Sequence, residues 1–444
     1  MKLILLSGGS GRRLWPLSND VRSKQFLKVL PASEGGTESM IQRVVRQIAE
    51  SGIDPAEIII ATSASQKELI ESQVGKDIHT VIEPMRRDTF PAIALSAAYL
   101  KSELNCPADE IVAVLPCDQY VDMSYFKTIR KMAELAASGA ADIVLMGIEP
   151  TSPSSAFGYM LPEKGNDGTI RVKEFVEKPD SERAMSIIRQ GGLGNGGVFA
   201  FSLGYMMDKL VELGHVTNYP LILENYGKLP KISFDYEVVE KAERICAVPY
   251  DGEWSDLGSW DSLVKKTGQV SGHTVISGCT GASVINELKI PVVCCGVDNV
   301  IVASSYDGIL VTSATKTSNL KNIVENLGQG PMYDVRSWGE VRRISCSDNA
   351  DGINSLTSHL LVKDGKSIGC HCHAERSEVW TIIKGRGLLA LDGKVMEVKT
   401  GDSITIPPLR RHAIKAIDEL ELIEVQFGRN LDEKDIKYFD FVWE

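Results

Sequence analysis

The chain has 444 residues, of which 43% are hydrophobic and 24% are charged, and its formal net charge is -11. This length is sufficient for about two or three domains that each bury a core, and the composition is that of a globular, soluble protein. The excess of acidic residues argues against nucleic acid or an anionic membrane surface as a partner.

The sequence gives three indications of where the protein is located in the cell. No run of 18 apolar residues occurs, so we expect no membrane-spanning helix. Only Lys2 and a very short apolar run precede the first glycines, so we expect no signal peptide. The nine cysteines, an odd number without framework spacing, favour a reducing compartment. We therefore expect a cytoplasmic protein of enzyme size.

The N-terminal stretch combines a short apolar run, residues 3–6, with a glycine-rich loop. Glycines without a Cβ let backbone N–H groups approach an anion closely. The next twenty residues are strongly basic, which in an acidic chain predicts a polyanionic ligand, although a solvated loop would give the same pattern. The cations are Arg12, Arg13, Arg22, Lys24 and Lys28, against the single acid Asp20.

Two familiar phosphate-binding motifs do not fit this loop. The P-loop string G-x-x-x-x-G-K followed by Ser or Thr does not occur. The dinucleotide fingerprint needs a glycine where Leu14 stands, which disfavours a Rossmann dehydrogenase.

Residues 1–265 alternate strand-like apolar runs with helical spacing, which predicts an α/β domain with a doubly wound, mostly parallel sheet. Ligands of such sheets bind at the carboxyl ends of the strands, where the glycine loop falls. The expected strands are 57–62, 79–82, 110–115 and 142–147, and the expected helices are 39–51, 91–104 and 125–138.

The rest of the chain is rich in β-like runs. Residues 266–332 contain HTVISG, GASVI, PVVCCGV, NVIVASS and GILVTS, which are typical of a short β-solenoid or a β-rich linker, without a clean hexapeptide period. In residues 333–444, strand-like runs are separated by turns at Gly365, Gly393 and Gly401. That spacing predicts a compact antiparallel barrel or jelly roll.

The strings GGSGRRLWPLS and SKQFL resemble the signature of the sugar-nucleotide pyrophosphorylases, most closely the mannose-1-phosphate guanylyltransferase branch. That branch has Thr where Arg12 stands and Pro where Ser23 stands. The resemblance implies transfer from GTP to mannose 1-phosphate with Mg²⁺, and release of pyrophosphate. It also implies that Arg13 and Lys24 neutralise the departing pyrophosphate, and that Leu6, Gly8, Gly9 and Gly11 bind the nucleotide.

Residues 83–100 resemble the E-P-x-x-R-x-T-x-P element of the same family, although a plain helix start would also explain them. The resemblance implies nucleotide contacts from Glu83, Arg87, Asp88 and Thr89. The family usually has Asn where Asp88 stands and Ala where Phe90 stands. A different base therefore remains an alternative.

Two carboxylates are candidates for a magnesium site. Asp118 in LPCDQY follows an apolar strand, and Asp256 lies in EWSDLGSW, which resembles the family string W-S-D-x-G-S-W. A lone Asp after a strand is more often a turn or cap residue. Two in matching strings favour Mg²⁺, which takes one or two carboxylates and phosphate oxygens.

Three further motifs resemble the sugar-phosphate site of the family. In FVEKPD, Pro179 favours an extended conformation for the preceding residue. The resemblance puts Lys178 on the sugar phosphate and Glu177 on the sugar hydroxyls. It adds Gly158 from AFGYM and Asn195 from GNGGVFAF as substrate contacts.

The C-terminal region resembles a cupin. Residues 365–385 fit the pattern G-x5-H-x-H-x4-E-x6-G. Side chains alternate along a strand, so we expect His371 and His373 on one side, with Cys370 and Cys372 on the other. With Glu378 and His412 of the second cupin element, these histidines suit a divalent transition metal such as Zn, Mn, Fe or Co.

In two-domain members of this family the cupin is a mannose-6-phosphate isomerase of type II. This chain departs from that pattern, which has Gln at His371, histidines at Ala374 and Glu375, and Arg at Ala413. Arg410 and Arg411 are then candidates for a phosphate anchor. Four hypotheses follow: a GTP- and mannose-specific homodimeric transferase, the same chemistry with another base or hexose, a bifunctional transferase–isomerase, and a non-catalytic sugar-nucleotide sensor.

Overall fold

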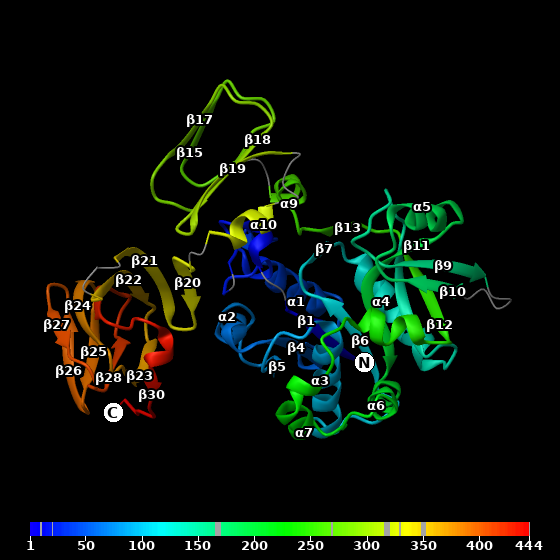
Figure 1. Ribbon diagram of the computed structural model, residues 1–444, viewed down its shortest axis with the longest axis horizontal. Helices are drawn as coiled ribbons and strands as arrows, with labels where there is room; N and C mark the ends of the chain where they lie inside the picture. The colour runs from blue at the N-terminus through cyan, green and yellow to red at the C-terminus, as the bar shows by residue number, and fades with distance from the viewer. Residues whose placement is uncertain are drawn as a thin grey trace. The chain divides into compact units, whose positions relative to one another are not determined.

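A computed structural model describes residues 1–8, 11–19, 21–164, 170–267, 270–314, 320–327, 330–347 and 352–443 (Figure 1). Contacts divide the chain into two compact units. The first comprises Met1–Ser10 and Ser23–Thr267, and the second comprises Gly11–Arg22 and Gly268–Glu444. A dozen residues from the N-terminal basic motif thus belong to the unit that is otherwise C-terminal.

The first unit is built on a nine-stranded sheet of order β5-β4-β1-β6-β11-β8-β12-β10-β9. One half is parallel, and β11 runs antiparallel to both β6 and β8, so the other half is mixed. The strands are β1 (Lys2–Leu6), β4 (Ile58–Ser63), β5 (His79–Glu83), β6 (Ile111–Pro116), β8 (Ile143–Ile148), β9 (Tyr159–Lys164), β10 (Ile170–Val176), β11 (Leu193–Ser202) and β12 (Ile245–Tyr250).

Both faces of this sheet are covered, which explains why its strands are continuous apolar runs. Ile4 packs in a cluster with the buried residues of α3 (Thr89–Ser102). The neighbouring Leu3 and Leu5 point to the opposite face and are also fully buried. On that face α4 (Ser124–Ala137) contacts β6, β8, β11 and β12. The predicted doubly wound α/β fold is confirmed.

The helices start and end close to where the sequence predicts. Ser39 caps α1 (Met40–Glu50) in a capping box with Gln42, which satisfies amide groups at the helix N-terminus. The remaining helices of the first unit are α2 (Ala64–Val74), α5 (Ser181–Arg189), α6 (Leu203–Glu212), α7 (Tyr219–Glu224), α8 (Phe234–Glu237) and α9 (Trp260–Thr267).

The carboxyl edge of the parallel half brings distant segments together. Leu6 and Pro116 are register partners at the ends of β1 and β6, and the amide of Cys117 donates to the carbonyl of Leu6 at 3.2 Å. Just beyond, β7 (Gln119–Val121) pairs with β13 (Trp254–Asp256). The two aspartate strings of the sequence therefore meet at this edge.

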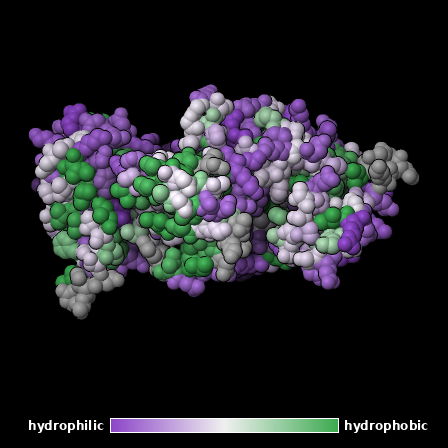
Figure 2. All heavy atoms as spheres, turned by 90° about the horizontal axis from the view of Figure 1, so that it is seen from above, coloured by the Kyte–Doolittle hydropathy of each residue, from purple (hydrophilic) through white to green (hydrophobic). Residues whose placement is uncertain are grey.

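The second unit begins with a short β-solenoid. Its parallel ladders are β14–β16–β18 and β15–β17, and Thr274 pairs with Val292 as Ser283 pairs with Ile301, each 18 residues later. Apolar side chains gather on the face seen in Figure 2 over these elements, and the exposed ones include Val275, Val293, Ile309 and Val311. The elements are β14 (Val270–Ser271), β15 (Thr274–Ser277), β16 (Ser283–Asn286), β17 (Val292–Cys295), β18 (Val300–Ser305), β19 (Gly308–Ser313) and α10 (Leu320–Glu325).

The second unit ends in a cupin barrel of two antiparallel sheets, as predicted. Trp380, Ile382, Leu389 and Ile414 lie in its core. One sheet contains β20 (Tyr333–Arg336), β21 (Gly339–Ser347), β22 (Asn354–Val362), β29 (Leu420–Gly428), β24 (Arg376–Lys384) and β27 (Ser403–Ile406). The other contains β26 (Lys394–Lys399), β25 (Arg386–Leu391), β28 (His412–Ala416), β23 (Ser367–Cys372) and β30 (Lys437–Tyr438).

Across the described residues, we find no helix with the length and apolar character needed to cross a membrane.

Candidate functional site

Lys24 lies between two carboxylates at the carboxyl edge of the parallel strands. Its Nζ is 2.9 Å from Asp118 Oδ2 and 2.7 Å from Asp256 Oδ1. Burial alone would lower the pKa of Lys24, but the charges of Asp118 and Asp256 outweigh it and the pKa is raised. Both carboxylates keep about a third of their side-chain surface exposed, at 28% and 31%. Cation and acids of the three predicted strings are thus assembled in one cluster.

The backbone around Lys24 is held by buried polar contacts. Gln25 donates to the carbonyl of Ser7 at 2.8 Å, which joins the lysine turn to the end of β1. Gln66 donates to the hydroxyl of Ser23 at 2.5 Å. Lys24 therefore has a defined position relative to the sheet edge.

The glycine loop is described only in part. Gly8 is exposed, Gly9 lies outside the described residues, and Arg13 is exposed within the 3₁₀ turn Gly11–Leu14. Arg22 does not face an open anion site, contrary to the prediction from the basic cluster. Its guanidinium forms two hydrogen bonds with Glu287, at 2.8 and 2.7 Å.

The predicted nucleotide element is tied to a later loop of the same unit. The Tyr226 hydroxyl donates to Glu83 at 2.7 Å, and the Arg87 guanidinium donates to the carbonyl of Leu229 at 2.8 Å. Burial raises the pKa of Glu83, while the Tyr226 hydrogen bond and Arg86 oppose it. The Thr89 hydroxyl accepts from the amide of Phe234 at 2.8 Å.

Asp88 occupies an unusual position at the start of α3. Its φ is 70°, in the left-handed region that few non-glycine residues adopt. Its side chain is exposed and accepts from the amide of Thr89 at 2.8 Å. The residue that departs from the family pattern is thus presented to solvent at the helix N-terminus.

The predicted sugar-phosphate residues meet around Gly158. A Cβ at this glycine would lie 2.5 Å from Glu177 Oε2 and 3.4 Å from Cβ of Asn195. The amide of Asn195 donates to the carbonyl of Gly158 at 2.8 Å, and the β11–β8 register shifts after Asn195. Glu177 Oε2 is buried without a hydrogen-bond partner among the described residues. It is therefore a free acceptor in a narrow polar site.

Asp235, at the start of α8, belongs to this site although sequence analysis did not select it. It accepts from the Asn195 side chain at 2.7 Å. Burial, reinforced by the charge of Glu177, raises its pKa to about 7. In the sequence, Asp235 follows Ser233 as an acid in the first turn of a helix commonly does, so nothing distinguished it from a capping residue.

Lys178 lies next to Glu177, with its Nζ 2.9 Å from Glu177 Oε1 and 5.7 Å from the centre of the Tyr236 ring. The expectation of an extended Lys178 is wrong, because its φ is 48°. The amide of Glu177 donates to Glu240 at 2.8 Å, so this sharp turn is stabilised from η5 (Val239–Lys241). The turn leaves almost half of the Lys178 side chain exposed, at 47%.

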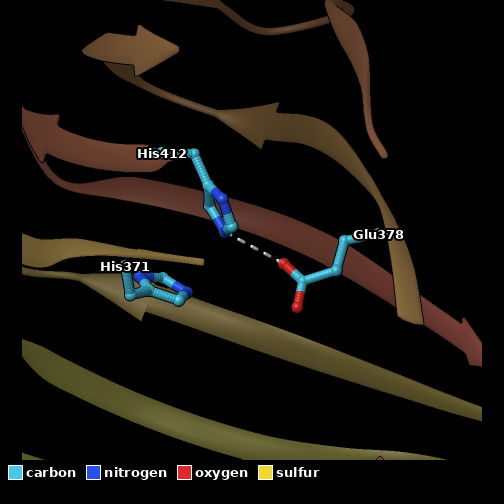
Figure 3. Close-up of side chains that lie close together, drawn as sticks. All are labelled: His371, Glu378 and His412. Carbon is cyan, nitrogen blue, oxygen red and sulfur yellow. Dashed lines mark ion pairs between the residues drawn. The ribbon is translucent and has the colours of Figure 1, made fainter. Parts of the chain in front are cut away.

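Three residues of the cupin converge on one point, as Figure 3 shows. Ligand atoms of His371, Glu378 and His412 all lie within 4.8 Å of one another, and all three residues are buried. His373 is adjacent, with Nε2 3.1 Å from Glu378 Oε1. The predicted set is assembled, with His373 slightly apart from the other three.

The imidazole rings in this cluster are oriented alike. Each histidine places Nδ1 on a backbone carbonyl: His371 on Gly369 at 2.8 Å, His373 on Arg376 at 2.7 Å and His412 on Arg410 at 2.9 Å. Nδ1 is thereby the protonated nitrogen, and Nε2 is left for a metal. Nε2 of His373 and of His412 is buried, 3.1 and 3.5 Å from the carboxylate oxygens of Glu378, but neither forms a hydrogen bond of good geometry among the described residues. This donor set fits a divalent transition metal.

Charge and hydrogen bonding also prepare Glu378 to be a ligand. Burial opposes its ionisation, but contacts with His373 and His412 prevail and lower its pKa. The Trp380 indole donates to both Glu378 Oε2 and Glu424 Oε1, each at 3.1 Å. Burial next to Glu378 raises the pKa of Glu424 to about 8. Sequence analysis missed Glu424 because its alternation along β29 is that of an ordinary strand residue.

A cavity of about 140 Å³ lies inside the barrel next to His371 and Glu378. Arg410 and Arg411 do not line it: Arg410 pairs with Asp392 at 2.7 Å, and Arg411 lies over the Phe439 ring. This cavity therefore gives no support to the hypothesis that they anchor a phosphate, which stays a prediction. The cations that line the cavity are Arg336, Arg343 and Arg376.

Known protein families match both parts of the chain. The nucleotidyl transferase family model matches residues 2–271, and the "Mannose-6-phosphate isomerase C-terminal" model matches residues 331–441. The protein called "Alginate biosynthesis protein AlgA" of Pseudomonas fluorescens is 30% identical, over 99% of this chain and 96% of that protein. "Mannose-1-phosphate guanylyltransferase RfbM" of Salmonella typhimurium is 29% identical, over 98% and 95%.

Among solved structures, the chain is similar to a crystal structure described as a "mannose-1-phosphate geranyltransferase" from Thermus thermophilus. The TM-score is 0.61 at 28% identity, and the match covers 74% of this chain and 99% of that one. The resemblance inferred from the glycine loop, the aspartate strings and the cupin pattern is thus confirmed over nearly the whole chain.

Proposed function

The chain belongs to the nucleotidyl transferase family, and we propose that it is a mannose-1-phosphate guanylyltransferase, which joins GTP and α-D-mannose 1-phosphate to give GDP-mannose and pyrophosphate. The observation that carries this proposal is the cluster of Lys24 with Asp118 and Asp256 at the carboxyl edge of the parallel strands. A transfer between phosphates needs positioning and charge neutralisation more than covalent chemistry from the protein.

In the proposed reaction, an oxygen of the sugar phosphate forms a bond to the α-phosphorus of GTP, and the bond from that phosphorus to the bridging oxygen of pyrophosphate breaks. Arg13 and Lys24 neutralise the negative charge that builds on the departing pyrophosphate. Asp118 and Asp256 would hold Mg²⁺, which suits two partly exposed carboxylates. The metal would supply charge neutralisation on the phosphate oxygens.

Four residues are proposed to bind the sugar phosphate. Glu177 offers a buried carboxylate oxygen without a partner among the described residues, which suits a sugar hydroxyl. Lys178 carries an exposed ammonium for the phosphate, and Gly158 leaves space that a side chain would fill. Asn195, oriented by Asp235, completes the set.

The nucleotide is proposed to lie along the glycine loop and the start of α3. The residues are Leu6, Gly8, Gly9, Gly11, Glu83, Arg87, Asp88 and Thr89. Arg87 and Thr89 are hydrogen-bonded to residues 226–234. This supports a rigid side of the nucleotide site here, and it does not require every one of these residues to contact the nucleotide directly.

The test is pyrophosphate release with Mg²⁺, with GTP, ATP, UTP, CTP and dTTP each combined with mannose-, glucose- and fucose-1-phosphate. We expect turnover with GTP and mannose 1-phosphate. Turnover with another pair alone would assign the same chemistry to a different base or hexose. Binding without turnover for every pair would favour a sugar-nucleotide sensor and contradict the proposal.

A second candidate function is favoured by the cupin cavity. Its His371, Glu378 and His412 cluster suits Zn, Mn, Fe or Co, and His373 is a fourth candidate ligand. The cavity beside it could admit a small polar substrate, and three arginines line it. The expected reaction is interconversion of mannose 6-phosphate and fructose 6-phosphate. Loading the protein with each metal and following fructose 6-phosphate consumption tests this activity.

We also propose that the protein is a cytoplasmic homodimer. Each chain is proposed to have a nucleotidyltransferase domain (residues 1–265), a β-rich segment (266–332) and a cupin domain (333–444). The exposed apolar side chains of β15, β17 and β19 support the solenoid as the surface that pairs with a second copy. Light scattering of the wild type and of a Val293→Lys variant tests this assembly, since a buried lysine at the interface would shift the mass to that of a monomer.

A further inference from the structure

The segment Gly11–Arg22 carries Arg13 and is followed, after Ser23, by Lys24, yet it belongs to the second unit. Its two ends are joined by peptide bonds to the glycine loop and to the lysine turn. The contacts that hold this segment therefore help to position the backbone of two cations of the proposed nucleotide site, Arg13 and Lys24.

Asn19 is a buried polar anchor of the segment. Its side-chain amide donates to Asp307 Oδ2 at 2.8 Å and to the carbonyl of Tyr333 at 3.1 Å. Its side-chain oxygen accepts from the amides of Val21 and Arg22, at 2.9 and 2.7 Å. Every hydrogen-bonding position of this amide is thus used to hold one backbone turn.

Asp307 connects that turn to the start of β20, the first strand of the barrel. Its second oxygen accepts from the amides of Met332 and Tyr333, at 2.5 and 3.3 Å. Asp307 is only 8% exposed, so loss of either partner would leave a buried polar group unsatisfied.

Arg22 supplies a second anchor only two residues before Lys24. It forms a bidentate pair with Glu287, which follows β16, and lies over the Tyr333 ring with its guanidinium 5.3 Å from the ring centre. The planar fork of arginine makes this geometry directional, which a single charge contact would not be.

A third contact is steric. Gly308 starts β19 with φ at 150°, and a Cβ there would lie 2.5 Å from the Trp15 ring. The Ser305 hydroxyl donates to the carbonyl of Pro16 at 2.6 Å. The β18–β19 hairpin is therefore shaped to receive the segment.

We propose that Glu287, Asp307 and Gly308 are positioning residues of the nucleotide site, which act through Arg22, Asn19 and Trp15 on the segment that carries Arg13. This inference rests on the proposed function. It adds that GTP binding depends on the solenoid and on the start of β20, the first strand of the barrel. The sugar phosphate, bound by other strands, does not depend on them.

The test compares Glu287→Gln, Arg22→Gln and the double variant with the wild type, using calorimetric binding of GTP with Mg²⁺ and steady-state kinetics. We expect Glu287→Gln to raise the Kd and KM for GTP about tenfold and to leave the KM for mannose 1-phosphate within about twofold. The double variant should be no worse than the worse single variant, because both remove one interaction.

Gly308→Ala provides a second variant that changes no charge, and we expect the same separation between the two substrates. Asp418→Asn is the matched control, because it breaks the ion pair with Arg386 in the same unit, away from the segment. It should leave GTP binding unchanged.

Unchanged GTP binding in Glu287→Gln and Gly308→Ala would overturn the inference. So would an equal rise in the KM for both substrates together with a lower melting temperature, since that would indicate a role in folding alone. If the wild type binds GTP without turnover, the proposed function fails and the Kd comparison still decides the inference. If the wild type binds no nucleotide, both fail.

Discussion

Lys24 and Asp256 are 232 residues apart in the chain, and their side chains are joined at 2.7 Å. Asp118 holds the same ammonium from the other side. The two carboxylates stabilise the protonated form of this lysine and balance its positive charge. The cluster thus keeps a strong cation and a potential metal site together at one strand edge.

Asp118→Asn should lower the rate of pyrophosphate release at least about a hundredfold, because it removes a carboxylate from both the lysine and the metal site. The melting temperature should change little, since the side chain is partly exposed. Asp261→Asn is the control, because Asp261 lies outside the cluster, at the start of α9, and pairs with Lys265 on the surface. Equal losses in both variants would contradict the assigned role.

Lys178→Ala should raise the KM for mannose 1-phosphate about tenfold or more, and the KM for GTP far less, because the ammonium is expected to meet only the sugar phosphate. Initial rates with each substrate varied separately measure this difference. Equal effects on the two KM values would show that the role assigned to Lys178 is wrong.

Gly158→Ala should impair sugar-phosphate binding while sparing GTP binding. The added methyl group would lie 2.5 Å from Glu177 Oε2 and would displace the carboxylate that faces the site. Gly330→Ala tests an exposed glycine instead, because nothing lies within 4 Å of its Cβ position and its backbone is not in the left-handed region. Full mannose 1-phosphate affinity in Gly158→Ala would rule out close approach of the sugar at this residue.

Asp235 should make stability depend on pH. Its pKa is about 7 in the folded protein because of burial and the charge of Glu177, whereas the ordinary value is 3.8. The folded state binds the proton more tightly, so the contribution to stability is present below about pH 4 and is lost as the pH rises through about 7. As the pH rises from 5 to 8, the stability of Asp235→Asn relative to the wild type should therefore increase, by about 2–3 kcal/mol. Denaturant unfolding at both pH values measures it, and identical pH profiles would contradict it.

His371→Ala combined with His373→Ala should remove bound transition metal from the cupin and leave nucleotidyl transfer largely intact. Metal content by plasma mass spectrometry, after loading and dialysis, should fall at least about tenfold. His359→Ala serves as the control, because His359 pairs with Glu421 outside the cluster. Retained metal in the double variant would place the binding site elsewhere.

Local patterns predicted most of this architecture. The strand after which Asp118 falls and the spacing of His371, His373 and Glu378 are properties of short stretches, so their periodicity carried the information. The left-handed φ of Lys178 was not predictable from Pro179, because the turn is stabilised by Glu240, 63 residues after Glu177.

Pairings between remote segments could not be predicted in the same way. Arg22 looks like a phosphate-binding cation until Glu287 is placed against it, 265 residues later. Asp235 resembles a helix-capping acid until Asn195 and Glu177 surround it. In each case the partner comes from the tertiary fold, on which a single sequence carries no signal.

The assignment of residues 11–22 to the second unit has a practical consequence for dissecting this protein into fragments. A fragment that ends near Thr267 would retain Leu14 and Leu17, both fully buried in the intact chain, but would lack the residues 268–444 that make up the rest of their unit. If such a fragment were inactive, the cause would then be that residues 11–22 have lost the residues they pack against, and not that the cupin is missing. Exchanging cupins between relatives at a junction after residue 333 would keep Glu287, Asp307 and Gly308 with the segment they hold, and is the cleaner way to separate the contributions of the two domains.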